Sequence, residues 1–368
     1  MHELKPLSLV RIEPLEVELT QLEDPYFIPK PFQLTIDAEP GFYLYEMNFL
    51  DTAGLPRRLR GIVGKLEINA QSDTLDHLRH TEAETEPHAL LHHPGNDKDD
   101  PFNDHRDTWG PVWLLVGEDR IASLLNFEGQ LVANVTDSNG MHHRMYHIYQ
   151  SGIIALIEEA LSHQPMTIAD GHHRLRRAVN GLNTSKKRSP DDRSEVIAFI
   201  STIETAEQCI RPIHRCYHLH GDPATFLAQL SEHFRLTEQS LPTLDSASRS
   251  LIAPTLITKD RAYQIEAVRS EDGSETETAA PDWIASNADS ELLSPHLKNL
   301  GHHIEYHLTV EDVLRSVAAE SSAIGLLCRG VSIERFKSAA EDEHLLPPKS
   351  ILFAPKPLAA LMLQESKI

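Results

Sequence analysis

The sequence predicts a mixed fold of strands and helices, of the α+β (mixed α/β) class, on three observations. Apolar runs such as residues 113–116 and 196–200 are too short for buried helices and are typical of buried strands. Residues 153–161 instead repeat apolar side chains at the spacing of an amphipathic helix. At residues 167–174 a short apolar run meets an Asp-Gly turn and a segment with helical spacing, which predicts a strand, a tight turn and a helix N-terminus.

The first hundred residues favour strands, and we assign residues 1–110 to an N-terminal β-rich part. Residues 42–47 are dense in aromatic side chains, and residues 60–68 alternate apolar and polar positions as a half-buried strand does. From residue 88 to residue 108 the chain is polar, rich in Asp and His, and contains a Pro-Gly pair, which predicts a loop.

The remaining chain divides at about residue 220. Residues 111–220 contain the strand, helix and strand around the Asp-Gly turn, with a predicted loop at residues 180–193. Residues 221–368 are expected to form a C-terminal α+β module. Its expected elements are helices at 223–234, with Asp222 as N-cap, and at 310–319, strands within 251–268 and at 323–327, and a loop at 270–280.

Charge and cysteine content narrow the functional classes. The chain has 368 residues, with 34 basic and 55 acidic side chains and a formal net charge of −21. A negative net charge of this size repels nucleic acid and anionic membranes, so neither is an expected partner. The three cysteines show no Cys-x-x-Cys spacing, which argues against a disulfide framework or a structural zinc site and fits a reducing compartment.

Sequence signals for export, membranes and several enzyme classes are missing. No signal-peptide core follows the first residues, and no apolar run approaches the roughly 20 residues of a transmembrane helix, so the expected location is the cytoplasm. His-Glu-x-x-His, Gly-x-Ser-x-Gly, Walker A and Gly-x-Gly-x-x-Gly motifs are all absent. Most of the 22 histidines are therefore expected at the surface or hydrogen-bonded in the core, and not on a metal.

The Asp-Gly turn at residues 170–171 carries the most specific chemical signal. Glycine permits a sharp turn and the close approach of a ligand. The first amides of the following helix lack internal partners and stand at the positive end of its dipole, and Arg174 adds donors that fit phosphate oxygens. The pattern therefore indicates phosphate binding. A structural alternative stays open, in which Asp170 caps the helix and His172 and His173 lie on its solvated face.

Four motifs resemble those of a known family and follow its order along the chain. Residues 170–174 (Asp-Gly-His-His-Arg) with Ala178 are similar to a D-G-H-H-R-Y-x-T-A signature, and residues 143–148 to an H-x-L-W-x-I stretch. Residues 212–215 resemble P-T-H-R, and residues 347–356 resemble a closing P-x-K-S-T-x-F-x-P-K. On these motifs the chain is identified as a member of the DUF1015 family. That family is similar to the ParB/sulfiredoxin-like superfamily, which includes the free serine kinases, so a ParB-like phosphate-binding core is implied for the middle part.

Three departures from the family motifs lie close to the implied chemistry. Leu175, Arg176 and Arg177 stand where the family has Tyr, any residue and Thr. The family's His-Glu-Arg-Thr element is represented only by residues 80–83, His-Thr-Glu-Ala, and Ile351 replaces a threonine. Either the substrate differs from that of typical members or the activity is weakened, and the sequence leaves both open.

The resemblance implies phosphoryl transfer between a nucleotide or pyrophosphate and a small hydroxyl metabolite, with a free amino acid such as serine as the leading acceptor. ATP, ADP or pyrophosphate is the implied donor. Mg²⁺ is the implied metal, with Asp170 as its candidate ligand, although Asp170 also competes for the N-cap role. Donor and acceptor are small molecules, and the sequence does not set the oligomeric state.

The same resemblance implies residue roles. Glu82 is the candidate general base, and His172 or His173 is a phosphate contact or an acid–base group. The implied phosphate or nucleotide contacts are Asp170, Gly171, His172, His173, Arg174, His214, Arg215 and Lys349, and Lys356 is a further cation that could reach phosphates. Each has a structural alternative: Glu82 as a surface side chain, His214 and Arg215 as the end of a strand, and the lysines as exposed charges.

Two other classes of function stay open. A non-catalytic regulator would bind a nucleotide or phosphometabolite tightly without turnover, because a turn of this type in the superfamily can bind CTP as a switch. A phosphatase or hydrolase would use the same anion site with water as the acceptor. A base close to Asp170 would favour a kinase or hydrolase over a regulator.

Overall fold

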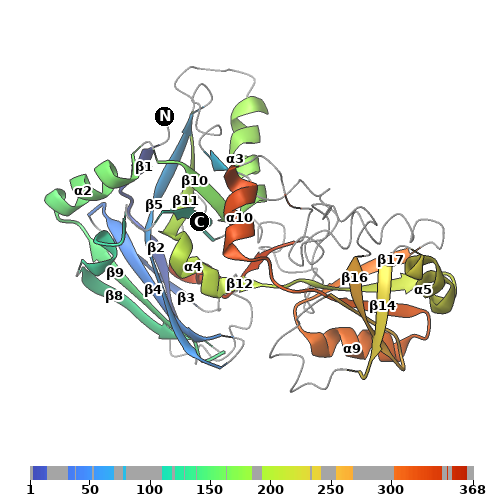
Figure 1. Ribbon diagram of the computed structural model, residues 1–368. Coiled ribbons are helices and arrows are strands. Elements are labelled where there is room, and N and C mark those ends of the chain that lie inside the picture. Colours follow the sequence, from blue (N-terminus) through green and yellow to red (C-terminus); the bar gives the residue numbers. More distant parts are fainter. Residues whose placement is uncertain are drawn as a thin grey trace. The chain divides into compact units, whose positions relative to one another are not determined.

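The computed structural model forms two compact units (Figure 1). The first unit comprises residues 1–80, 96–209 and 353–368, and the second comprises residues 81–95 and 210–352. The residues that the structure describes are 3–14, 32–37, 39–51, 54–69, 78–79, 110–117, 121–127, 129–137, 139–162, 164–184, 193–232, 234–241, 254–267, 302–341, 346 and 350–362.

This division differs from the three consecutive parts expected from the sequence. The first unit builds one sheet from strands on both sides of residue 110, and the C-terminal residues return to it. Strands that are neighbours in a sheet need not be neighbours in the chain, so local composition could not show where a unit closes. The predicted loops at 88–108 and 270–280 lie outside the described residues.

The first sheet has nine strands among the described residues, in the order β6-β10-β7-β11-β5-β4-β9-β8, with β1 also paired to β5. Most neighbours are antiparallel, but β10 runs parallel to β6 and β11 runs parallel to β7. Their bounds are β1 Glu3–Lys5, β4 Phe42–Leu50, β5 Pro56–Asn69, β6 Leu78–Arg79, β7 Val112–Val116, β8 Gln130–Thr136, β9 His142–Ile148, β10 Met166–Asp170 and β11 Arg193–Thr202.

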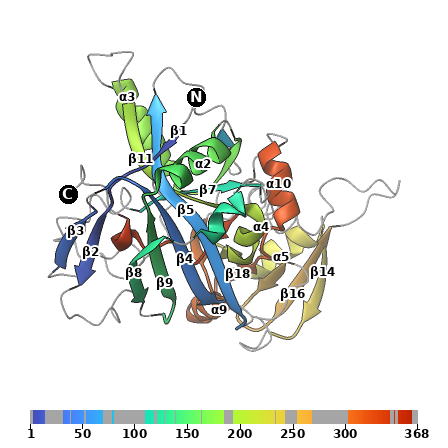
Figure 2. The same cartoon turned by 90° about the vertical axis from the view of Figure 1, so that its left-hand side faces the viewer.

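The long strand β5 organises this sheet (Figure 2). One edge of β5 pairs with β4 and then with β1, and the other edge pairs with β11. Because side chains alternate along a strand, neighbouring residues of β7 face opposite sides of the sheet. Leu114 packs in the apolar core beneath α2 and α3, and Trp113 contacts Phe199 and Phe353 on the other side. Both faces of the central strands are therefore buried.

Two helices cover one face of the first sheet, and both were expected from the sequence. Helix α2 spans Ser151–Leu161 and helix α3 spans His172–Thr184. Ile157 and Leu161 of α2 and Leu175 of α3 lie in the core against the sheet. The predicted loop from residue 180 is wrong for its first five residues, because α3 continues to Thr184 and tolerates Gly181 in its interior.

Short elements complete the first unit. Strands β2 (Val10–Pro14) and β3 (Phe32–Ile36) form a separate antiparallel pair. The short helices are η3 (Leu124–Asn126), α4 (Ile203–Ala206), η4 (Glu207–Cys209) and η7 (Ala359–Leu361). Strands β12 (Ile210–Arg211) and β19 (Leu352–Phe353) form another two-stranded pair.

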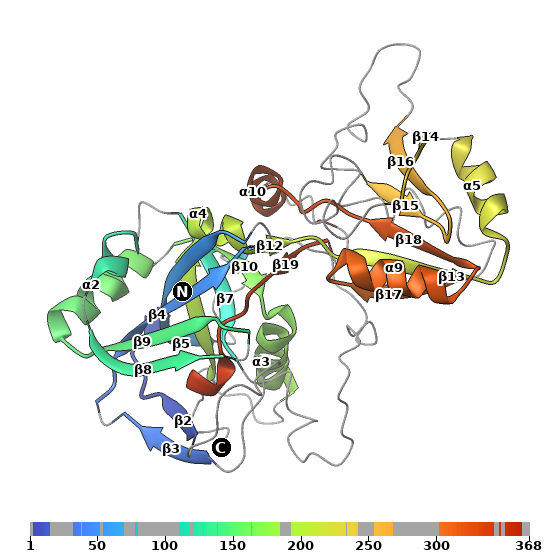
Figure 3. The same cartoon turned by 90° about the horizontal axis from the view of Figure 1, so that it is seen from below.

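The second unit contains a six-stranded antiparallel sheet among the described residues, in the order β14-β16-β15-β18-β13-β17 (Figure 3). Helices α5 and α9 pack on opposite faces: Phe226 of α5 lies in one core cluster with Tyr217, and Val313 of α9 lies in another with Cys216. The bounds are β13 His214–Leu219, α5 Pro223–Ser231, β14 Phe234–Gln239, β15 Thr255–Ile257, β16 Ala262–Ala267, β17 His302–His307, α9 Val310–Ala319, β18 Ala323–Leu327 and α10 Ile333–Glu341.

Most elements predicted for the C-terminal part are confirmed. The Asp222 side chain accepts a hydrogen bond from the Ala224 amide at 3.0 Å and caps α5 as expected. That helix ends at Ser231, before the predicted end, because Phe234 begins β14. Among the described residues, no helix is long and apolar enough to cross a membrane. The mixed α/β fold class is confirmed.

Candidate functional site

The turn between β10 and α3 requires a glycine. Gly171 has a backbone φ of +94°, which residues with a Cβ rarely adopt. A Cβ at this position would lie 2.9 Å from an Arg174 nitrogen and 3.1 Å from the Val112 Cα. The pairing of β10 with β7 also shifts register between Ile168 and Asp170, an irregularity that redirects the end of the strand. The backbone therefore turns tightly under the Arg174 side chain.

Two cations converge on the Asp170 carboxylate. Arg174 donates to Oδ2 and Lys356 donates to Oδ1, each at 2.7 Å. The exposed fractions are 23% for Asp170, 10% for Arg174 and 23% for Lys356, so the group is largely shielded from water. Burial acts to raise the pKa of Asp170, but the charges and hydrogen bonds of Lys356 and Arg174 outweigh it and hold that pKa well below its usual range. Asp170 therefore stays ionised, and the three side chains together carry one net positive charge.

Arg174 is fixed by more than this ion pair. Its Nη2 atom also donates to the Pro111 carbonyl oxygen at 2.9 Å, at the start of β7. Arg174 stands four residues after Asp170, and α3 holds that spacing. A guanidinium held by both a carboxylate and a carbonyl has lost much of its freedom, so its plane keeps a fixed direction.

The N-terminus of α3 lies at the same turn. The Leu175 amide donates to the Gly171 carbonyl at 3.0 Å, the first helical hydrogen bond of α3. The amides before Leu175 precede the first i−4 carbonyl of the helix and stand at the positive end of its dipole. His172, the first residue of α3, is half-buried, and the side chain of His173 lies outside the described part of the chain.

Two of the other predicted site residues belong to the second unit. His214 and Arg215 begin β13 and are 3% and 1% exposed. His214 Nδ1 accepts from the Cys328 amide at 3.1 Å, and Arg215 donates to the Ile213 carbonyl at 2.7 Å and stacks over the Tyr306 ring at 5.7 Å. Burial, with the charges of Arg215 and His307, lowers the pKa of His214 to about 4, so it is neutral at pH 7.

Two further predicted residues, Glu82 and Lys349, lie outside the described residues. Their roles as general base and phosphate contact stay predictions, as do the phosphate contacts of His214 and Arg215. Lys356, from the same closing motif as Lys349, is the lysine that reaches Asp170.

A divalent metal does not fit the Asp170 carboxylate in this arrangement. Each of its oxygens already accepts from a cationic donor, and Arg174 and Lys356 would repel a second positive ion at this distance. Within the described part of the chain, no group of three or more His, Cys, Asp or Glu side chains could hold a metal ion. Binding of an anion suits the same charges.

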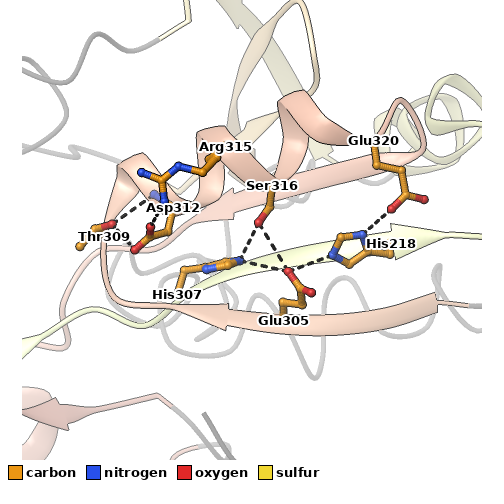
Figure 4. A network of polar contacts seen from close by, with 8 residues as sticks. All are labelled: His218, Glu305, His307, Thr309, Asp312, Arg315, Ser316 and Glu320. Atoms are coloured by element: carbon orange, nitrogen blue, oxygen red, sulfur yellow. Dashed lines mark hydrogen bonds and ion pairs between the residues drawn. The ribbon is translucent and has the colours of Figure 1, made fainter. Parts of the chain in front are cut away.

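A second polar cluster lies in the second unit (Figure 4). His218 of β13 is bonded to Glu320 at 2.7 Å through Nδ1 and to Glu305 at 3.2 Å through Nε2. Ser316 of α9 contacts both Glu305 and His307. Burial acts to lower the pKa of His218, but its bonds to Glu320 and Glu305 outweigh burial and raise it. The two glutamates are 48% and 43% exposed, so water screens this cluster.

Comparison with known proteins places the chain in a family. The profile described as "Protein of unknown function (DUF1015)" matches residues 33–290. That match covers well over half of the chain, which therefore belongs to the DUF1015 family. The membership expected from the four motifs is confirmed. No curated protein matches the chain.

Solved structures give weaker likenesses. A free serine kinase in complex with AMP has a TM-score of 0.38 and 12% identity, over 80% of this chain and 88% of that one. A conserved hypothetical protein from Pyrococcus furiosus gives 0.36 and 12%, over 80% and 92%. SbnI with a C-terminal truncation, from Staphylococcus aureus, gives 0.38 and 10%, over 82% and 91%. TM-scores below 0.5 are too low to assign an activity.

Proposed function

We propose that this member of the DUF1015 family binds the phosphate group of a small phosphorylated molecule at the β10–α3 turn. The protein uses that site for phosphoryl transfer between a nucleotide or pyrophosphate and a small hydroxyl metabolite, with a free amino acid such as serine as the leading acceptor. The family resemblance suggests the reaction, and the turn supplies the chemistry that it needs.

One observation carries this proposal: two cationic side chains from distant parts of the chain meet one carboxylate at a helix N-terminus. Arg174 and Lys356 outnumber Asp170 within the group, whereas acidic side chains outnumber basic ones in the chain as a whole. An anion beside this group would meet a surplus positive charge and the amides of the first turn of α3. Gly171 has no Cβ, which at this position would lie 2.9 Å from an Arg174 nitrogen.

The residues then divide the work of phosphoryl transfer. Arg174 offers its fork of donors to phosphate oxygens, and Lys356 adds a point charge that offsets negative charge developing in the transition state. Asp170 orients both cations and remains ionised, since its pKa is well below the usual range. His172, His173 or Glu82 would accept the proton of the acceptor hydroxyl.

A specific observation favours a second candidate, a regulator that binds a nucleotide without turnover. Among the described residues at the turn, Asp170 is the acidic group, and its low pKa and two cationic partners make it a poor proton acceptor. If no other group at the turn accepts the proton of the acceptor hydroxyl, the site binds and holds its ligand without turnover. Turnover must therefore be measured separately from binding.

A thermal-shift screen tests the binding step. The panel is ATP, ADP, CTP, pyrophosphate and phosphoserine, each with and without Mg²⁺, against wild type, Arg174→Ala and Arg315→Ala. Arg315 is an exposed cation of α9, so its variant matches the change in net charge. A ligand that binds only the folded protein raises the melting temperature. We expect a shift that is lost in Arg174→Ala and kept in Arg315→Ala, and the absence of any shift would overturn the proposal.

Product analysis by ³¹P NMR then distinguishes the reactions. The bound donor is incubated with free serine and with other small hydroxyl compounds, and separately with no acceptor. A new phosphate ester that requires the acceptor supports phosphoryl transfer. Release of inorganic phosphate without an acceptor indicates a hydrolase, and tight binding with no product indicates the regulator.

A further inference from the structure

Hydrogen bonds join three buried polar side chains of the first sheet, and the proposed function gives these residues no role. The hydroxyl of Tyr45 on β4 lies 2.7 Å from His143 Nδ1 on β9, and His143 Nε2 lies 3.4 Å from Asp137 Oδ2. The three residues are 0%, 1% and 7% exposed. Asp137 Oδ1 accepts from the amides of Asn139 and Met141, each at 2.9 Å. His143 belongs to the motif at residues 143–148 that marks the family.

The partners assign the direction of each hydrogen bond. Burial acts to raise the pKa of Asp137, but its bond from His143 and the two amide bonds lower it, so this carboxylate only accepts. Nε2 of His143 must then donate, and in the neutral imidazole Nδ1 accepts the Tyr45 proton. Burial raises the pKa of Tyr45 far above its usual range, so the phenol keeps that proton.

At the Tyr45 end, this series of hydrogen bonds reaches the C-terminal segment of the protein. The Tyr45 oxygen, whose proton is directed to His143, accepts from the Leu358 amide at 2.9 Å. Leu358 stands two residues after Lys356. Two residues before Lys356, the Ala354 amide donates to the Cys209 carbonyl at 2.8 Å. The backbone on both sides of Lys356 is therefore tied to the first unit.

We propose that Tyr45, oriented by His143 and Asp137, is a positioning residue that holds the C-terminal segment so that Lys356 reaches Asp170. The role of Lys356 toward phosphate rests on the proposed function, but its placement at Asp170 does not. A lysine side chain has a flexible stem of four carbons, so its ammonium stays at one carboxylate oxygen only where its backbone is fixed. Tyr45 holds the backbone at Leu358, after Lys356 in the sequence, and the Cys209 carbonyl holds it at Ala354, before Lys356.

The competing explanation is that Tyr45 only stabilises the core. The chain offers a matched control in Tyr43, which lies two residues earlier on the same strand and is equally buried. Its hydroxyl donates to Asp37 at 2.7 Å and accepts from the Leu9 amide at 3.1 Å, so it ties the N-terminal segment instead. Loss of either hydroxyl removes the two hydrogen bonds named for it, and those of Tyr45 include the bond to the segment that carries Lys356.

The first measurement needs no ligand. The titration of the Asp170 carboxyl is followed by ¹³C NMR in wild type, Tyr45→Phe, Tyr43→Phe, Lys356→Met and the double variant Tyr45→Phe/Lys356→Met. Removing a cation from a carboxylate raises its pKa. We expect Lys356→Met to raise the pKa of Asp170, Tyr45→Phe to raise it part of the way, and the double variant to equal Lys356→Met alone. Tyr43→Phe should leave it at the wild-type value.

Two results would overturn the positioning role: a wild-type Asp170 titration in Tyr45→Phe, or an effect of Tyr45→Phe that persists at full size without Lys356. If Tyr45→Phe does not fold, His143→Gln serves as the second variant, because it disturbs the orientation of the phenol and leaves its bond from Leu358. It should shift the same titration in the same direction by a smaller amount.

The second measurement is the affinity for pyrophosphate of the same variants. We expect Lys356→Met to weaken binding about tenfold and Tyr45→Phe by a smaller factor, with no further loss in the double variant. If no variant and no wild type binds pyrophosphate or the screened ligands, the proposed function fails, whereas the NMR titration still decides whether Tyr45 positions Lys356.

Discussion

The two units each contain a charged residue shared between two partners of opposite sign, and the two arrangements differ in sign and shielding. At the β10–α3 turn one carboxylate, Asp170, holds two cations, and all three side chains are at most 23% exposed. In the second unit one imidazole, His218, lies between two glutamates that are 43% and 48% exposed. The first arrangement has surplus positive charge in a shielded place, and the second has surplus negative charge in water.

The difference shows why the first cluster is a candidate for ligand binding and the second is not. Charges interact more strongly where water is excluded, and exposed ion pairs are screened and contribute little. A shielded surplus of positive charge attracts an anion more strongly than an exposed one does. The exposed surplus around His218 is already solvated. A network of many contacts, such as that of Figure 4, is therefore weaker evidence for function than three side chains around one turn.

The largest expected effect comes from Asp170→Asn, which leaves two shielded cations without their carboxylate. We expect the free energy of unfolding to fall by about 2–4 kcal/mol at pH 7, toward the lower end of the range for broken buried pairs, because the group is partly exposed. Urea denaturation measures it. The matched control is Glu238→Gln, which breaks the exposed pair with Arg261 and should leave stability unchanged within error.

The pH dependence of that difference has a definite sign. The folded-state pKa of Asp170 is depressed, so its stabilisation is fully present above the unfolded-state pKa of about 3.9 and is lost as the pH falls toward the folded-state value. The gap in stability between wild type and Asp170→Asn should be constant from pH 5 to pH 8 and should shrink below pH 4. A gap that stays constant down to pH 3 would contradict the low pKa.

Gly171→Ala should have the next largest effect, since it combines an unfavourable φ with contacts of about 3 Å to Arg174 and Val112. We expect a loss of about 1–3 kcal/mol in stability, and a weaker response to phosphate ligands in the thermal-shift screen. Gly152→Ala is the control, because a Cβ in α2 meets nothing within 4 Å and alanine favours helix. Equal behaviour of the two variants would remove the turn from the account.

His218→Gln should have the smallest effect, below about 1 kcal/mol, as is usual for exposed ion pairs. The folded-state pKa of His218 is raised, so its contribution is fully present below the unfolded-state pKa of about 6.5 and is lost as the pH rises through the folded-state value. The effect should therefore be larger at pH 6 than at pH 9 and should fade in 0.5 M salt. A larger loss at pH 9 would reverse this interpretation.

Local signals made much of the first unit predictable from the sequence. The strand, Asp-Gly turn and helix around residues 166–184 follow from apolar run, turn residue and helical spacing, each of which lies within a few residues. The sequence also singled out Arg174 and Gly171. It placed the start of the next loop five residues early, because a glycine inside a helix gives the same signal as a glycine that ends one.

Long-range contacts could not be predicted in the same way. Lys356 reaches Asp170 across 186 residues, and Tyr45 reaches Leu358 across 313 residues. Neither contact leaves a periodic pattern in the chain. The burial of Arg215 on β13 beside Tyr306 depends on such contacts as well, and its expected phosphate contact stays a prediction. The division into two units also depends on such contacts.

The central claim is that Arg174 and Lys356 together form an anion site, and titration calorimetry with pyrophosphate tests it most directly. The proteins are wild type, Arg174→Met, Lys356→Met and two controls, Arg315→Met and Lys259→Met, which remove exposed cations of the second unit. Loss of a charge-assisted hydrogen bond costs about 1.5–3 kcal/mol, so we predict at least about tenfold weaker binding in each site variant and wild-type affinity in both controls. Equal affinity in all five proteins, or no binding to wild type, would contradict the account.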